Sequence, residues 1–118
     1  MIETSIYTVL STDVTVSALV STRIYPMIIP QNGTLPAVVY QRVSTLPINS
    51  LSGDSGLDSV RIQLSCWSPT YAGAKSLGLA VRNALTLSSL KAITEMELDD
   101  IDDLTGHYRV ILDFRIWQ

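Results

Sequence analysis

The side chains that most often perform catalysis are scarce in this chain of 118 residues. It has one cysteine, Cys66, and one histidine, His107, and the two lie far apart in the sequence. A nucleophilic cysteine needs a neighbouring base, and a structural zinc ion needs four ligands. The sequence also lacks a glycine-rich phosphate loop, an HExxH helix and a GxSxG turn. We therefore expect no enzyme, no catalytic residues, no metal site and no cofactor.

Acidic residues are concentrated between positions 95 and 103, which hold six of the eleven in the chain. Asp100 and Asp102 have the spacing of the first two ligands of a calcium loop, but Leu104 occupies the fifth position and breaks the pattern. We place this segment on a surface turn. It is either a solvated turn or a negative surface that would repel DNA in the channel of a ring. The residues of that surface would be Asp99, Asp100, Asp102 and Asp103.

The composition fits one globular domain over residues 1–118. Apolar residues make up 47% and charged residues 16%, so the chain can form a hydrophobic core. No apolar run reaches the roughly 18 residues that span a bilayer, and we find no signal peptide. The net charge is −3, without the basic stripe of a protein that reads nucleic-acid sequence.

Three helices are predicted. Apolar residues recur at helical spacing over residues 2–10, and Thr12 or Asp13 is placed to cap a second short helix. A longer helix over residues 69–86 begins at Pro69, with Ser68 as its cap.

The long helix contains two glycines, Gly73 and Gly78. Each costs up to about 1 kcal/mol relative to alanine in a helix interior. A close approach of the helix to the sheet would explain why they are tolerated.

Strands are predicted over residues 37–43, 60–67, 91–98 and 108–117, with a short extended piece over 23–26. The elements follow the order α-α-β-β-α-β-β. Strands joined by hairpins, with the helices grouped apart, indicate an α+β fold. We expect a mostly antiparallel sheet of about four strands, one long helix packed across it and two short N-terminal helices.

Two strands carry side chains of interest. Cys66 has the phase of the apolar residues in its strand, which indicates a small buried side chain. The last strand alternates, and Arg109, Arg115 and Trp117 share the face that is either exposed or buried against another subunit.

The connection over residues 44–56 is long, polar and glycine-containing, which is unusual in a compact domain. It is either an idle mobile loop or a hairpin arm that becomes ordered against a partner. Its apolar residues are Leu46, Ile48 and Leu51, and exposed apolar side chains often mark contact sites.

Four stretches occur in a characteristic order. They are 14–26, with Ala18-Leu19-Val20 and Arg23-Ile24-Tyr25-Pro26; 35–42, Leu35-Pro36-Ala37-Val38-Val39-Tyr40-Gln41-Arg42; 60–85, with Gln63-Leu64-Ser65-Cys66-Trp67, Thr70-Tyr71-Ala72 and Ala80-Val81-Arg82; and 112–117, Leu112-Asp113-Phe114-Arg115-Ile116-Trp117. Together they resemble the tail completion or tail terminator proteins of long-tailed bacteriophages, which also occur in prophages and gene transfer agents. Ser21 is one departure, because the family often has glycine there.

The resemblance implies a structural virion protein that forms a hexameric ring at the head-proximal end of the tail, stops growth of the tail tube and offers a head-joining surface. Its partners would be further copies of itself, the major tail tube protein and the head-completion protein. DNA would pass through the ring without sequence-specific binding, and no membrane is involved. The protein would be assembled in the bacterial host cytoplasm and end in the virion tail.

A ring contact is heterologous, so two different surfaces of the subunit must match. Arginine and tryptophan are enriched among interface hot spots. The residues that we assign to partner or ring contacts are Leu46, Ile48, Leu51, Arg109, Arg115 and Trp117. The alternatives are a head–tail connector or another minor tail component and, from other classes, a host-factor binding module or a small enzyme.

Overall fold

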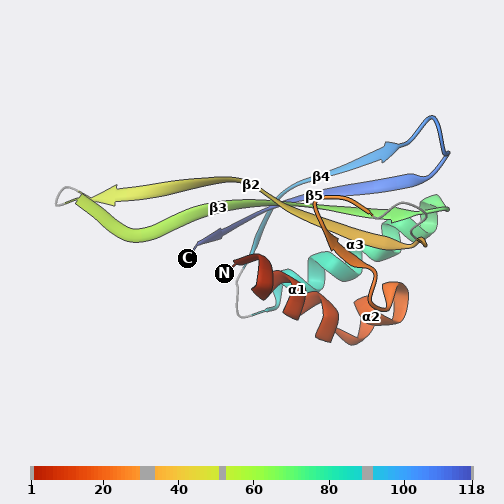
Figure 1. Ribbon diagram of the computed structural model, residues 1–118, viewed down its shortest axis with the longest axis horizontal. Coiled ribbons are helices and arrows are strands. Elements are labelled where there is room, and N and C mark those ends of the chain that lie inside the picture. Colours follow the sequence, from red (N-terminus) through yellow and green to blue (C-terminus); the bar gives the residue numbers. More distant parts are fainter. Residues whose placement is uncertain (1, 30–33, 51–52, 89–91, 118) are drawn as a thin grey trace.

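The computed structural model describes residues 2–29, 34–50, 53–88 and 92–117. Its elements are α1 (Ile2–Thr12), α2 (Val14–Val20), β1 (Ile24–Pro26), β2 (Ala37–Ser50), β3 (Gly53–Ser68), α3 (Tyr71–Thr86), β4 (Ile93–Ile101) and β5 (Tyr108–Trp117). The helices lie together below the sheet, and β2 and β3 extend far beyond it on one side (Figure 1).

The sheet has five strands in the order β1-β2-β3-β5-β4. β1 runs parallel to β2, and all other neighbours are antiparallel. The predicted α+β class is confirmed. The expected number of about four strands omits β1, because this three-residue segment was read only as an extended piece.

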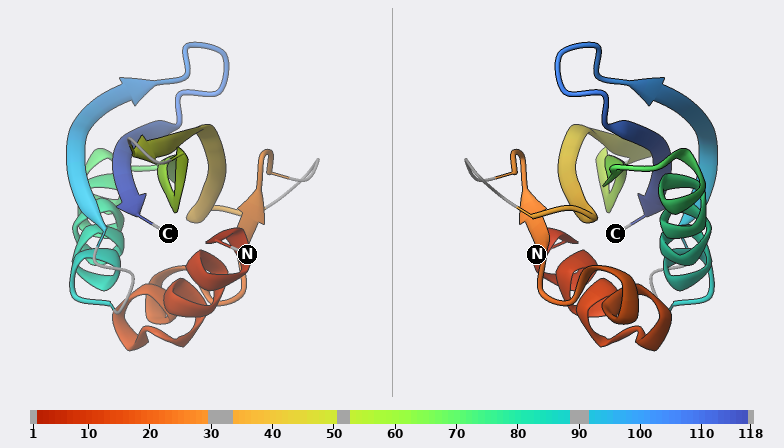
Figure 2. Two further views of the ribbon diagram at one scale, coloured as in Figure 1. Left: turned by 90° about the vertical axis from the view of Figure 1, so that its left-hand side faces the viewer. Right: turned by 90° about the vertical axis from the view of Figure 1, so that its right-hand side faces the viewer.

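The core lies between the helices and the concave side of the curved sheet (Figure 2). In β5, the buried side chains of Val110, Leu112, Phe114 and Ile116 alternate as the sequence pattern predicts. Burial of each of the larger ones contributes about 1.5–3 kcal/mol relative to exposure. Because these side chains point toward the helices, the alternate residues of β5 point to the other face of the sheet.

The two short helices form where the sequence predicts them. Asp13 is the cap of α2, and its Oδ1 accepts a hydrogen bond from the Val16 backbone N–H at 3.0 Å. This bond satisfies one of the free N–H groups of the first turn. Ile6, Val16 and Val20 are fully buried, so packing on the core holds both helices in place.

The long helix begins later than predicted. Its cap is Thr70 rather than Ser68, because the Thr70 Oγ1 accepts the bond from Gly73 N–H at 3.1 Å. A Cβ on Gly78 would lie 3.0 Å from Cγ1 of Val110 in β5, and one on Gly73 would clash with the Ser68 hydroxyl. Close packing therefore explains both glycines, and for Gly78 the predicted approach to the sheet is confirmed.

Of the two interpretations of residues 44–56, a loop or a hairpin, the structure shows a hairpin, because strand pairing continues through almost all of the segment. Ser50 of β2 pairs with Gly53 of β3. β5 accompanies β3 only as far as Ser59, which pairs with Leu46 of β2. Residues 47–50 and 53–58 therefore form a two-stranded ribbon beyond the body, which we call the hairpin arm (Figure 1). The polar residues and glycines of this segment give no strand pattern in the sequence. Register shifts after Arg42 and Ile48 interrupt the regular pairing of the two strands.

The acidic segment is not a single surface turn. β4 extends to Ile101, so Asp99 and Asp100 are strand residues, and the turn comes after them. Asp100 pairs across the strands with Arg109, and opposite charges in that position favour strand pairing.

Candidate assembly surface

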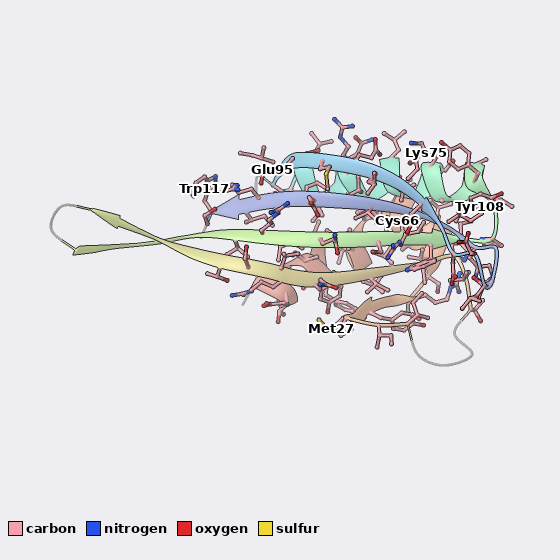
Figure 3. All side chains as sticks on the ribbon, turned by 90° about the horizontal axis from the view of Figure 1, so that it is seen from above. Met27, Cys66, Lys75, Glu95, Tyr108 and Trp117 are labelled. Carbon is pink, nitrogen blue, oxygen red and sulfur yellow. The ribbon has the colours of Figure 1, made fainter. Side chains whose placement is uncertain are left out.

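One face of the sheet is covered by no helix among the residues that the structure describes (Figure 3). We call it the open face. Strand alternation places on it the residues of β3 and β5 that point away from the core. These residues are Ser59, Arg61, Gln63, Ser65, Trp67, Arg109, Ile111, Asp113, Arg115 and Trp117.

Arginines tie the strands of the open face together. Arg61 of β3 lies 3.1 Å from Asp113 of β5. Arg115 of β5 reaches outward to Glu95 of β4 at 2.8 Å and inward to the Ser59 hydroxyl of β3 at 2.8 Å. The Arg115–Glu95 pair is about one-third exposed, and surface pairs of this kind contribute at most about 1 kcal/mol. The carboxylate of Asp113 is almost fully buried, so its pairing with Arg61 avoids an uncompensated buried charge.

Two arginines of the open face also lie over tryptophan rings. The guanidinium carbon of Arg109 is 5.0 Å from the centre of the Trp67 ring. That of Arg115 is 6.0 Å from the centre of the Trp117 ring. Cation–π contacts of this kind are worth about 0.5–1 kcal/mol when exposed and more when a partner removes water. The paired rings and guanidinium groups therefore favour a surface that a protein partner covers.

Two buried polar atoms on this face have no hydrogen-bond partner among the described residues. Asp113 is only 3% exposed, and its Oδ1 has no hydrogen-bond partner among the described residues. The same holds for Nε of Arg109, which lines a hollow of about 240 Å³ together with Trp67 and Met27. Both atoms are shielded from solvent, so a partner could bond to them only after the neighbouring side chains move.

Of the predicted contact residues, the structure brings Arg109, Arg115 and Trp117 together on the open face. Leu46 lies in β2 at the base of the hairpin arm and Ile48 lies within the arm, but their side chains are outside the described part of the chain. Leu51 lies outside the described residues altogether. The two predicted groups are therefore a sheet face and an arm that continues two strands of the same sheet.

The predicted acidic surface divides between the two faces of β4. Asp99 points toward α3, where it accepts hydrogen bonds from the Tyr71 hydroxyl at 2.7 Å and the Lys75 ammonium at 3.1 Å. These bonds, with that of Tyr71 the stronger, lower the pKa of Asp99. Asp100 points to the open face and bonds to Arg109, which lowers the pKa of Asp100 in turn.

The other two acidic residues lie in the turn before β5. Asp102 caps that turn, because its carboxylate accepts bonds from the Leu104 N–H and the Thr105 hydroxyl, both at 3.0 Å. Asp103 is exposed. Thus two of the four predicted carboxylates have a cation as an in-chain partner, and a third has a structural role in the turn.

The reactive side chains of the described residues form neither an ionised thiol nor a metal cluster. Cys66 is fully buried, and burial raises its pKa to about 12, so its thiol is not ionised near neutral pH. Among the described residues, no three His, Cys, Asp or Glu side chains gather closely enough to hold a metal ion. Nor does any helix in this part of the chain have the length and apolarity needed to cross a bilayer.

Sequence reasoning assigned no contact to Arg61, Trp67 or Asp113, which the structure places in the centre of the open face. A signal for them was present in the sequence. Arg61 and Trp67 lie out of phase with the buried residues of β3, as Asp113 does in β5. What the sequence could not provide is the register that sets Arg61 beside Asp113.

Comparisons with known proteins show the fold and the family of this chain. In the solved structure of the virion of a native gene transfer agent particle, one chain superposes with a TM-score of 0.65, at 21% identity, over 95% of this chain and 90% of that chain. This likeness shows a shared fold. No curated protein matches the chain significantly. The sequence profile of the tail completion protein gp17 family matches residues 4–118, and the chain therefore belongs to that family.

Proposed function

We propose that this protein is a non-enzymatic structural component of a phage tail. In this proposal, copies form a hexameric ring at the head-proximal end, stop growth of the tail tube and offer a surface to the head-completion protein. Membership of the tail completion family over nearly the whole chain supports the proposal. The ring would be assembled in the host cytoplasm and remain in the virion tail.

The observation that carries this proposal is the hairpin arm. β1 pairs with β2 only at residues 38–40, and β5 pairs with β3 no further than Ser59. The arm is therefore an isolated two-stranded ribbon, which is marginally stable in water at best. A ribbon of this kind gains stability when it docks, so it suits a contact with the tail tube or a neighbouring copy. The open face, with its arginines and tryptophans, provides a second contact surface.

DNA would pass through such a ring without being read. We keep the proposal that the acidic end of β4 and the following turn face the channel, where negative charge repels phosphate. Lys75 and Arg109 partly neutralise that charge, so Asp103, exposed in the turn, is the carboxylate best placed to act on DNA.

Light scattering tests the ring directly. We would measure the molar mass of the purified protein over a concentration series, with and without assembled tail tubes. A hexamer, or retention on tubes in multiples of six copies, is the expected result. A monomer that does not bind tubes would contradict the proposal and favour a connector or an unrelated binding module.

A shortened variant tests whether the arm is the docking element. Leu46 pairs with Ser59, so residues 47–58 can be replaced by an Asn-Gly turn, which suits a two-residue hairpin. Val60, which is fully buried, stays in place and the core is preserved. We expect the variant to fold with an unchanged helical circular dichroism signal and a cooperative unfolding transition, and to lose tube retention at least tenfold. Full retention would assign docking to another surface.

A further inference from the structure

The sheet ends in two open edges, and they lie on opposite sides of the subunit. Glu95 on β4 marks one edge, and Met27 after β1 marks the other (Figure 3). We propose that β4 of one copy pairs antiparallel with residues 41–50 of β2 in the next copy. The contact would seat Ile101 in a hollow of the neighbour. This inference rests on the proposed ring and specifies the contact that builds it.

β4 is an edge strand in which four acidic residues and one register shift, between Thr94 and Met96, stand beside a set of exposed apolar side chains. It has nine residues, almost all of them exposed, and contains neither lysine nor proline. Four large apolar side chains on it are 44–54% exposed. An exposed edge strand presents a row of unpaired N–H and C=O groups to a further strand. The four side chains are Ile93, Met96, Leu98 and Ile101.

The opposite edge has an open stretch of matching length. β1 covers β2 only at residues 38–40, and the Met27 N–H bonds once more to the Tyr40 carbonyl. Beyond that point, no described strand pairs with β2 on this side. Residues 41–50 of β2 therefore form an open edge of ten residues, against the nine of β4.

Strand direction allows the two edges to pair. β2 and β3, β3 and β5, and β5 and β4 are each antiparallel. It follows that β4 runs opposite to β2. A neighbour in the same orientation would then continue the sheet with an antiparallel pair, the slightly more stable pattern.

A hollow lies where β1 ends and the open stretch begins. It has a volume of about 400 Å³ and is lined by Glu3, Thr4 and Tyr7 of α1, Pro26 of β1 and Tyr40 of β2. Because α1 lines it, the hollow opens on the helix side of the sheet. An apolar side chain entering from that side would cover the exposed ring of Tyr7.

Ile101 is on the correct side of β4 to enter this hollow. It pairs with Tyr108, whose side chain packs against the core, and paired residues of neighbouring strands point to the same face. In the antiparallel arrangement, Ile101 ends β4 at the beginning of the open stretch, next to Tyr40. The side of β4 on which Ile101 lies, and its place at the end of that strand, therefore agree with antiparallel pairing to β2 of the neighbour.

Charge favours this contact over pairing of β4 with itself. β4 carries four acidic residues, whereas residues 41–50 contain no acidic residue and one cation, Arg42, which is paired with Glu3 of its own subunit at 2.7 Å. Two copies of β4 side by side would place like charges against each other, which destabilises a strand pair. A contact between two different edges is heterologous and can close into a ring.

Disulfide trapping tests the contact. We would combine Tyr7→Cys with Ile101→Cys, both at exposed positions, and keep the buried Cys66. The two new cysteines lie at opposite edges of one subunit, too far apart for a bond within it. Oxidation on tail tubes should yield a ladder of covalent multimers up to the closed ring. The pair of Tyr7→Cys with Leu104→Cys, in the turn beyond β4, should give at least tenfold less.

The outcomes separate this inference from the proposed function. If the wild-type protein forms rings by light scattering but Tyr7→Cys and Ile101→Cys do not cross-link, the edge contact is wrong and the ring stands. If the two control cysteines cross-link equally well, the register is wrong. If the wild-type protein forms no ring on tubes, both proposals fail.

Discussion

At the scale of single residues, Ser21 has the most unusual backbone. It follows α2 with φ 54° and ψ −116°, a combination that glycine adopts readily and other residues rarely do. The sequence comparison marked this position as one where the family often has glycine. The physical reason is now visible, because the chain reverses here to enter β1.

Replacing Ser21 by glycine should therefore stabilise the protein. Relief of an unfavourable φ and ψ raises the free energy of unfolding by about 1–3 kcal/mol. The greater freedom of glycine in the unfolded chain lowers it by roughly 0.5–1 kcal/mol. We expect the free energy of unfolding to rise by about 1 kcal/mol in urea titrations. The same change at Ser17, inside α2, should lower it. A loss at Ser21 would show that its conformation carries no strain.

Burial of Cys66 gives a second prediction, with a defined pH dependence. Burial raises the pKa of this thiol from 9.0 to about 12. In the unfolded chain the thiol ionises near pH 9, while in the folded protein it stays protonated. The stability that Cys66 contributes is therefore complete below pH 9 and is lost as the pH rises from 9 to about 12.

Thiol chemistry and unfolding curves check this prediction. A thiol reagent at pH 8 should modify Cys66 only after urea unfolds the protein, and a Cys66→Ala variant should lack this part of the alkaline loss of stability. Rapid modification of the native protein would contradict the burial of the side chain.

At the scale of elements, the sequence predicted strands and helices well where one face is uniformly apolar. β5 was predicted with its bounds and both faces, because its core-facing positions are all apolar and three of the five alternate positions carry charged side chains. The hairpin arm was only one of two interpretations of its segment, and its strands were predicted too short, because backbone pairing, and not an apolar pattern, continues β2 and β3 beyond Leu46 and Ser59. The start of α3 was missed because Ser68 and Thr70 are both good caps, and only the geometry chooses Thr70.

The packing of α3 on β5 gives an element-scale prediction. Alanine at Gly78 gains up to about 1 kcal/mol of helix propensity. Its Cβ, however, would lie 3.0 Å from Cγ1 of Val110, which is 1% exposed and cannot yield easily. Overpacking typically costs about 1–3 kcal/mol, so we expect Gly78→Ala to lower the free energy of unfolding.

A double-mutant cycle isolates that contact. In a Val110→Ala background, the same Gly78→Ala change should become neutral or stabilising. Ser76→Ala, on the exposed side of α3, serves as the control and should be slightly stabilising in both backgrounds. Equal effects of Gly78→Ala in the two backgrounds would show that helix and strand do not meet as described.

At the scale of the whole molecule, the chain is a compact body with a long arm, 51 × 29 × 23 Å along its principal axes. Sequence reasoning placed three contact residues, Arg109, Arg115 and Trp117, on what is now the open face. It could not foresee that Arg61 and Asp113 join them, because that depends on strand register. Nor could it foresee the two open edges of the sheet, which exist only once the strand order is known.

The central claim is that this protein ends the growth of a tail tube. Its most direct test is the length distribution of tubes, measured by electron microscopy, when purified tube protein polymerises with increasing amounts of this chain. We predict shorter tubes that carry a ring of extra density at one end, and no shortening with the arm-shortened variant. Tubes of unchanged length without density at either end would contradict the claim.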